Sequence, residues 1–287
     1  MWRCAKKGDR SAGVQRQYSG TAGRVENSQV GVFLCYASPH GAAFLDRALY
    51  LPREWAGDAD RRRAAGVPEE AAFATKPALG RQLLERALDA GVPAAWITGD
   101  AVYGSDRRLR VWLESRRQPF VLGIRSNEPL WLDGPHYVPA ADVAAALPPE
   151  GWRRLAAEPG AKGPRMHEWA WREVWRLQLT AGERAWGHWL LARRSLADPT
   201  DIAYYIVFAP RRRATLARLA AAAGMRWQIE GAFEAAKGEC GLDEYEVRRW
   251  DAWHRHITLA LLAHAFLVAV RAAEAKKARL ANSPCGW

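Results

Sequence analysis

The stretch Met225-Arg-Trp-Gln-Ile-Glu-Gly-Ala-Phe-Glu-Ala-Ala-Lys237 decides how this chain is interpreted. It consists of good helix formers, and Gly231 is its one weak point. On a helix of about 100° per residue, four apolar side chains fall on one side. These residues are Ile229, Ala232, Phe233 and Ala236. The pattern predicts an amphipathic helix with one buried face.

Three charged residues, Arg226, Glu230 and Lys237, lie together on the flank of that apolar face, within roughly 40° of one another. A carboxylate at the edge of a buried face needs a charge partner or a metal ion. The two long cations beside it favour an anionic ligand such as phosphate. A solvated charged face explains the same three residues without a ligand. The helix alone leaves both interpretations open.

The spacing Arg226-x3-Glu230-x6-Lys237 resembles the signature of bacterial insertion-sequence transposases of the DDE type. In that family the Glu is the third metal-binding carboxylate. A Tyr precedes the Arg by three positions in the family, whereas this chain has Ala223 there. The resemblance continues through Gly-Leu-Asp-Glu-Tyr-Glu-Val-Arg at residues 241–248 and through residues 254–262.

Composition places the chain among globular proteins that act on a polyanion. Its 287 residues are 49% hydrophobic and 25% charged, which suffices for a large core. The net charge of +11 favours a nucleic-acid partner, although the Arg- and Ala-rich composition of a GC-rich genome raises it too. The four cysteines are scattered, so neither a zinc site nor a disulfide framework is predicted.

Nothing in the sequence predicts a membrane partner. The N-terminus lacks the apolar segment of a signal peptide. The longest apolar run, residues 257–270, is too short to cross a bilayer and is typical of a buried helix. We therefore expect a cytoplasmic protein that associates with the nucleoid when it is bound to DNA.

The first half of the chain predicts a mixed α/β arrangement. The expected elements are strands at 29–36, 43–51, 94–98 and 120–124, and helices at 75–90 and 106–117. The first two strands form an antiparallel hairpin. The later strand–helix–strand order predicts parallel strands covered by helices. In such sheets the functional crevice lies at the carboxyl ends of the strands, where Asp100 is expected.

The residues alone support an α/β class with a mixed sheet. Residues 127–212 contain several alternating stretches, and helices are expected at 216–239 and 250–278. The transposase resemblance implies a ribonuclease-H-like mixed sheet flanked by helices, with a β-rich insertion before the final catalytic helix. It divides the chain into a first catalytic part at 1–126, the insertion at 127–212, and a helical part at 213–287 that carries Glu230.

The resemblance also implies the chemistry. Three carboxylates in the family hold two divalent cations about 3.5–4 Å apart, which activate the attacking oxygen and stabilise the leaving one. We expect Mg²⁺ or Mn²⁺, because both ions prefer oxygen ligands. Asp100 in Trp96-Ile-Thr-Gly-Asp-Ala-Val-Tyr-Gly104 matches the second acid, and Glu230 matches the third. Both are therefore expected to be catalytic metal ligands, while an Asp that merely ends a strand is the alternative for Asp100.

Arg226 and Lys237 are expected to contact the phosphates of double-stranded DNA, at the transposon ends and the target. Ordinary ion pairs with nearby acids are the alternative for both cations. The chain could act as a homodimer on DNA. Four aromatic residues favour a structural role, with base stacking as the alternative for the two Trp residues and a functional role as the alternative for the two His residues. They are Trp227, Trp250, His254 and His256.

The family's first Asp lies just upstream of a Lys-Lys-Gly segment. Here Lys6-Lys7-Gly8 is preceded only by Met-Trp-Arg-Cys-Ala, which contains no acid, and Asp9 lies past that segment. We therefore expect an N-terminally truncated and inactive remainder of a transposase. The competing functions are a nucleic-acid-binding remnant without catalysis and a ribonuclease-H-like nuclease of host function.

From this pattern we predict no Mg²⁺- or Mn²⁺-dependent cleavage of end-sequence DNA by the 287-residue polypeptide, because two acids stand where three are required. A plasmid-nicking assay with each metal measures this. Robust metal-dependent cleavage would refute the expectation and point to a substitute acid, with Asp9 the first to test.

Overall fold

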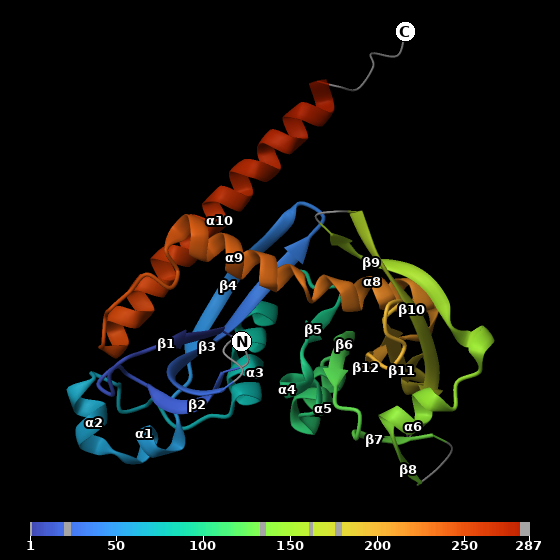
Figure 1. Ribbon diagram of the computed structural model, residues 1–287, viewed down its shortest axis with the longest axis horizontal. Coiled ribbons are helices and arrows are strands. Elements are labelled where there is room, and N and C mark those ends of the chain that lie inside the picture. Colours follow the sequence, from blue (N-terminus) through green and yellow to red (C-terminus); the bar gives the residue numbers. More distant parts are fainter. Residues whose placement is uncertain (1, 20–23, 133–135, 161–162, 176–179, 282–287) are drawn as a thin grey trace. The chain divides into compact units, whose positions relative to one another are not determined.

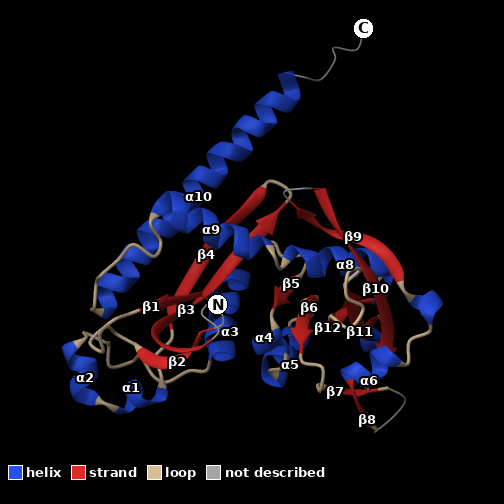
Figure 2. Ribbon diagram, viewed as in Figure 1, coloured by secondary structure: helices blue, strands red, loops and turns tan. Residues whose placement is uncertain are grey.

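The computed structural model describes residues 2–19, 24–132, 136–160, 163–175 and 180–281 (Figures 1 and 2). The chain forms two compact units. The first unit joins Met1–Gly91 to Gln228–Trp287, and the second is Val92–Trp227. The chain therefore leaves the first unit once and returns to it once. The three-part division drawn from the sequence stays a prediction.

The first unit is built on one long strand. Its strands are β1 (Trp2–Ala5), β2 (Gln15–Ser19), β3 (Arg24–Ser38) and β4 (Gly41–Leu49). β3 pairs antiparallel with each of the other three. The predicted hairpin is confirmed as β3 and β4, and β3 extends beyond the predicted residues 29–36 to a length of 15 residues.

Helices of the first unit come from both ends of the chain. They are α1 (Arg53–Gly57), α2 (Ala59–Ala64), α3 (Lys76–Asp89), α9 (Gln228–Cys240) and α10 (Trp250–Ala281). α3 confirms the helix predicted at 75–90, and the Thr75 side chain caps it by accepting from the Ala78 amide. α3, α9 and α10 all contact the β3–β4 hairpin.

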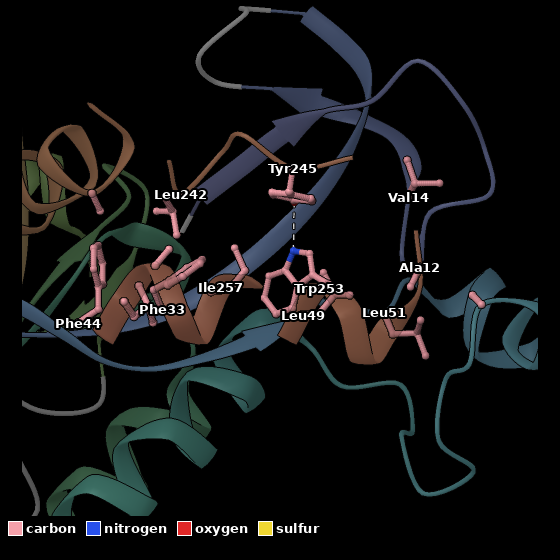
Figure 3. Packing of buried hydrophobic residues seen from close by; sticks show 14 of the residues in the cluster. Ala12, Val14, Phe33, Phe44, Leu49, Leu51, Leu242, Tyr245, Trp253 and Ile257 are labelled. Atoms are coloured by element: carbon pink, nitrogen blue, oxygen red, sulfur yellow. Dashed lines mark hydrogen bonds between the residues drawn. The ribbon is translucent and has the colours of Figure 1, made fainter. Parts of the chain in front are cut away.

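The core of the first unit joins the two chain ends (Figure 3). The predicted apolar face of the helix after residue 225 is confirmed, because Ala232 and Ala236 are buried in this core. Phe233 packs on the rings of Phe33 and Phe44, with ring centroids 5.2 and 4.7 Å away. Burial of such aromatic and aliphatic surface is the main favourable term in folding, so the C-terminal helices complete the N-terminal sheet.

A chain of buried hydrogen bonds runs through the same core. The Trp253 indole donates to the Tyr245 hydroxyl at 3.1 Å, as Figure 3 shows. That hydroxyl donates to Gln29 Oε1 at 3.1 Å, and Gln29 Nε2 donates to the Ala12 carbonyl at 2.7 Å. Burial raises the pKa of the Tyr245 phenol, which keeps the hydroxyl protonated as a donor.

The second unit contains a six-stranded mixed sheet. Its order is β5 (Ile97–Gly99), β6 (Phe120–Ile124), β12 (Ile202–Pro210), β11 (Trp186–Arg194), β10 (Gly163–Val174) and β9 (Arg153–Gly160). β5 and β6 are parallel, and all other neighbours are antiparallel. The strands predicted between 127 and 212 thus extend the sheet that begins with β5 and β6. A small hairpin joins β7 (Pro129–Trp131) to β8 (Tyr137–Pro139).

Short helices flank this sheet. They are α4 (Ala101–Gly104), α5 (Arg107–Ser115), α6 (Ala140–Ala145), α7 (Ala181–Arg184) and α8 (Leu216–Met225), with 3-10 turns at Pro149–Gly151 and Arg211–Arg213. α8 contacts β5, β6, β9 and β10, and its buried alanines pack in the core of one sheet face. The fold is a mixed α/β arrangement with a curled mixed sheet flanked by helices, which confirms the predicted ribonuclease-H-like class.

The continuous helix predicted at 216–239 is wrong. Two bonds of the i→i−3 type interrupt it, because Arg226 N donates to the Ala223 carbonyl and Trp227 N donates to the Gly224 carbonyl. Tightening of this kind breaks the α-helical ladder, and Gly224 weakens the helix at that point. α8 therefore ends at Met225 and α9 begins at Gln228.

Tyr245→Phe should lower the free energy of unfolding by about 1–3 kcal/mol, because the Trp253 indole and Gln29 Oε1 both lose a buried partner. Urea unfolding followed by tryptophan fluorescence measures the loss. Tyr137→Phe, which changes an exposed tyrosine in the same way, is the matched control. Equal midpoints for the two variants would contradict the role of the buried hydroxyl.

Candidate functional site

Asp100 lies at the carboxyl end of β5, where the sequence predicts it. Its backbone is extended and its side chain caps α4, with Oδ1 accepting from the Val102 amide at 2.9 Å. The Asp100 carbonyl accepts from the amides of Tyr103 and Gly104, both at 3.0 Å. The strand end and the first turn of α4 thus fix the direction of this carboxylate, and Oδ2 makes no hydrogen bond with the described part of the chain.

Two glycines explain why the turn after Asp100 can lie against the sheet. A Cβ atom on Gly104 would stand 1.9 Å from the Gly123 carbonyl oxygen of β6 and 2.9 Å from Leu122 Cβ. A Cβ on Gly123 would meet the backbone of Asp100 and Ala101 at 3.3 Å. Only hydrogen at Gly104 permits this close packing of helix backbone on strand backbone, and a side chain at Gly123 would require its neighbours to shift slightly.

Tyr103, which belongs to the same motif, is half-buried. Burial, and then the charge of Asp100, raise the pKa of its phenol. The phenol therefore stays protonated at neutral pH. Tyr103 accordingly acts as a packing residue that supports the turn.

The Asp100 carboxylate lines a cavity of about 380 Å³ in the second unit. Its polar lining residues are Asp100, Ser126, Arg193, Tyr204, Tyr205, Arg226 and Trp227. Arg193 comes from β11, Tyr204 from β12, and Arg226 and Trp227 from the turn after α8. The cavity therefore gathers the Asp100 carboxylate and two guanidinium groups that lie more than 90 residues after it in the sequence.

Both guanidinium groups pack on one indole ring. Arg226 Cζ lies 3.9 Å from the centroid of the Trp227 ring, and Arg193 Cζ lies 5.8 Å from it. Such cation–π contacts orient the planar cations. The Trp227 Nε1 atom is buried and has no hydrogen-bond partner in the described structure. The arrangement presents two oriented cations beside Asp100, which suits an anionic ligand.

Of the four predicted site residues, the structure brings Asp100 and Arg226 together. Glu230 and Lys237 lie on α9, which belongs to the first unit. The predicted grouping of Arg226 with Glu230 and Lys237 on one helix is wrong, because α9 begins after Arg226. Lys237 Nζ pairs with Asp243 Oδ2 at 3.6 Å, as the ion-pair alternative expects.

The aromatic candidates on α10 have structural partners. His254 Nδ1 lies 2.9 Å from the Trp250 carbonyl one turn earlier, and burial lowers its pKa. His256 Nε2 lies 3.1 Å from the Gly241 carbonyl, and its ring packs on Tyr245. Trp250 packs against the core of the first unit. These contacts agree with the packing role favoured for these residues.

Within the described residues no three of His, Cys, Asp and Glu lie close enough to form a ready metal site. Asp100 is the acid among the cavity-lining residues, and its Oδ2 is an oxygen donor of the kind that Mg²⁺ and Mn²⁺ prefer. Arg193 and Tyr204 were missed by sequence reasoning. Alternation identifies their strands, but it does not reveal which strand of the 127–212 segment pairs with β6.

Gly104→Ala should destabilise the second unit by about 1–3 kcal/mol, because the added methyl group overlaps the Gly123 carbonyl. Thermal unfolding measures the shift. Gly231→Ala is the control, since a Cβ there meets nothing within 4 Å and alanine favours a helix. A Gly104→Ala protein as stable as the control would disprove the close approach.

Comparison with known families agrees with this geometry. Residues 4–184 match the model of the DDE superfamily endonuclease, a region that includes Asp100 but ends before Glu230. No curated protein matches the chain. Endonucleases of this superfamily act on DNA and generally depend on divalent metal ions. Because the match covers more than half of the sequence, the chain belongs to the DDE superfamily endonucleases.

Proposed function

We propose that this endonuclease family member is of the transposase type, a class of enzyme that cleaves DNA strands and joins them to a target, and that Asp100 and Glu230 are two of its metal-binding acids. The observation that carries the proposal is the cavity in which the Asp100 carboxylate stands beside Arg193 and Arg226. The signature spacing from Arg226 to Glu230 supports the second acid.

Each residue has a distinct part in this proposal. A divalent ion, when bound at Asp100, would supply Lewis acidity and an activated oxygen nucleophile. Arg193 and Arg226 bind the phosphate to be cleaved, because a guanidinium group donates two parallel hydrogen bonds to phosphate oxygens. Trp227 orients both cations through its ring. The α4 cap holds the Asp100 carboxylate in place, so the metal-binding oxygen is positioned before the substrate arrives.

A DNA-binding protein without catalysis is the second candidate. The net charge of +11 and the two cavity arginines favour it equally, since neither depends on a metal. The two candidates differ in what Asp100 does. In the transposase the carboxylate binds a divalent ion, whereas in the binding protein it only caps α4. Both candidates place the protein in the cytoplasm with the DNA.

Arg193→Ala and Arg226→Ala should each weaken binding to duplex DNA roughly tenfold at moderate salt, and each should reduce the slope of log affinity against log salt by about 1. Fluorescence anisotropy over a salt series measures both quantities. Arg63→Ala, which removes one charge from an exposed ion pair with Asp60, is the matched control. An unchanged slope in both cavity variants would remove these arginines from the DNA site.

Asp100→Asn should abolish the tightest Mn²⁺ site, as measured by electron paramagnetic resonance of free Mn²⁺ during titration. Asp106→Asn is the matched control, because Asp106 also caps a helix and accepts from the Leu109 amide at 2.8 Å. Asn caps a helix about as well as Asp, so both variants keep their turns. Mn²⁺ binding that survives Asp100→Asn, or falls equally in Asp106→Asn, would favour the binding protein without catalysis.

A further inference from the structure

α10 presents an apolar face that its own unit does not cover. The helix has 32 residues, and its inner face buries Trp253, Ile257, Ala260 and Leu261 in the core of the first unit. Other side chains of the helix are largely exposed, namely Leu259 (60%), Leu262 (66%), Phe266 (66%) and Val270 (42%). Figure 1 shows the C-terminal half of α10 running away from the β3–β4 hairpin of its unit.

These exposed residues form one continuous stripe. At about 100° per residue, all lie within roughly 60° of Leu259, and Ala263 and Ala273 join them. We call the set Leu259, Leu262, Ala263, Phe266, Val270 and Ala273 the outer stripe. It extends over four turns, about 21 Å along the helix axis. Soluble proteins rarely leave a contiguous apolar surface of this kind uncovered, so the stripe calls for a partner.

A bilayer does not fit the stripe as well as another helix does. Trp250–Ala278 is the described segment long and apolar enough by composition to cross a membrane. Its first half, however, already packs against the sheet of the first unit, and the stripe follows one side of the helix only. A narrow apolar seam with charged residues at both ends is typical of helix–helix association.

The charges at the two ends of the stripe indicate the orientation of the partner helix. Asp251 and Arg255 flank its N-terminal end, and Glu274 and Lys277 flank its C-terminal end, all of them exposed. If a second copy of α10 runs antiparallel about a two-fold axis between residues 264 and 265, Arg255 meets Glu274 of the other copy. Asp251 meets the Lys277 of that copy to within one residue of the same register. A parallel pair would instead place like charges together.

The same register matches the sizes of the apolar side chains. Leu259 faces Val270 of the other copy, and the small Ala263 faces the large Phe266. An interface of this type is isologous, because the same patch serves both copies. We propose that the outer stripe of α10 is a self-association surface, through which two copies of this chain form an antiparallel homodimer in the absence of DNA.

The test is the mass of the full chain in solution, measured by sedimentation equilibrium without DNA or metal. We expect a dimer. Phe266→Glu should raise its dissociation constant by at least about tenfold, as for the loss of a central aromatic contact. Val111→Glu is the matched control, because Val111 is 63% exposed on a helix of the other unit and should leave the dimer unchanged.

Charge reversal tests the register. Arg255→Glu should weaken the dimer, and adding Glu274→Arg should restore it, because the second change rebuilds the opposite-charge pair across the two-fold axis. Rescue by the second change is specific to the antiparallel arrangement, since a parallel pair does not bring these residues together.

Several outcomes would overturn the proposal. One is a chain that stays monomeric at every concentration, and another is a dimer that Phe266→Glu leaves intact. A monomer whose thermal stability falls with Phe266→Glu would show that the chain itself covers the stripe. A monomer that floats with lipid vesicles in a density gradient would assign the stripe to a membrane surface instead.

Discussion

The chain of hydrogen bonds from Trp253 through Tyr245 and Gln29 to the Ala12 carbonyl is the interaction on which the first unit depends. It joins segments from opposite ends of the sequence inside an apolar core, where an unpaired polar group is costly. Two backbone bonds reinforce the same junction, from the Ala12 amide to the Arg248 carbonyl and from the Trp250 amide to the Ala65 carbonyl. The N-terminal sheet therefore requires the C-terminal helices. α9, which carries Glu230, is held against this sheet by its buried alanines.

Local patterns predicted the individual elements well. The Phe120–Ile124 strand coincides with the predicted apolar run. The helix after Thr75 begins at its N-cap, and its buried residues follow the helical period. The helix across residues 225–228 was the main error, because favourable propensity concealed the break at Arg226 and Trp227. The strand order of the second sheet could not be predicted from the sequence, because alternation identifies the buried face of a strand but not the strand that pairs with it.

The candidate site was predictable where a motif is local and not where it is assembled by the fold. Asp100 follows from a strand, a turn and a short helix within ten residues. Arg193 reaches the same cavity only because β12 lies between β6 and β11, a pairing that no short stretch encodes. Gly104 was part of the recognised motif. The need for glycine at this position became clear only from the Gly123 carbonyl, which leaves no space for a side chain.

The division of the chain into a continuous unit and a split unit has a consequence for synthesis on the ribosome. Every residue of Val92–Trp227 has been made before α9 emerges, so the second unit can fold while translation continues. The first unit must wait for the last sixty residues, and its early sheet stays without a complete core until then. Closing a contact across more than 200 residues is slow, so the exposed β3–β4 hairpin is the part of the nascent chain most in need of a chaperone.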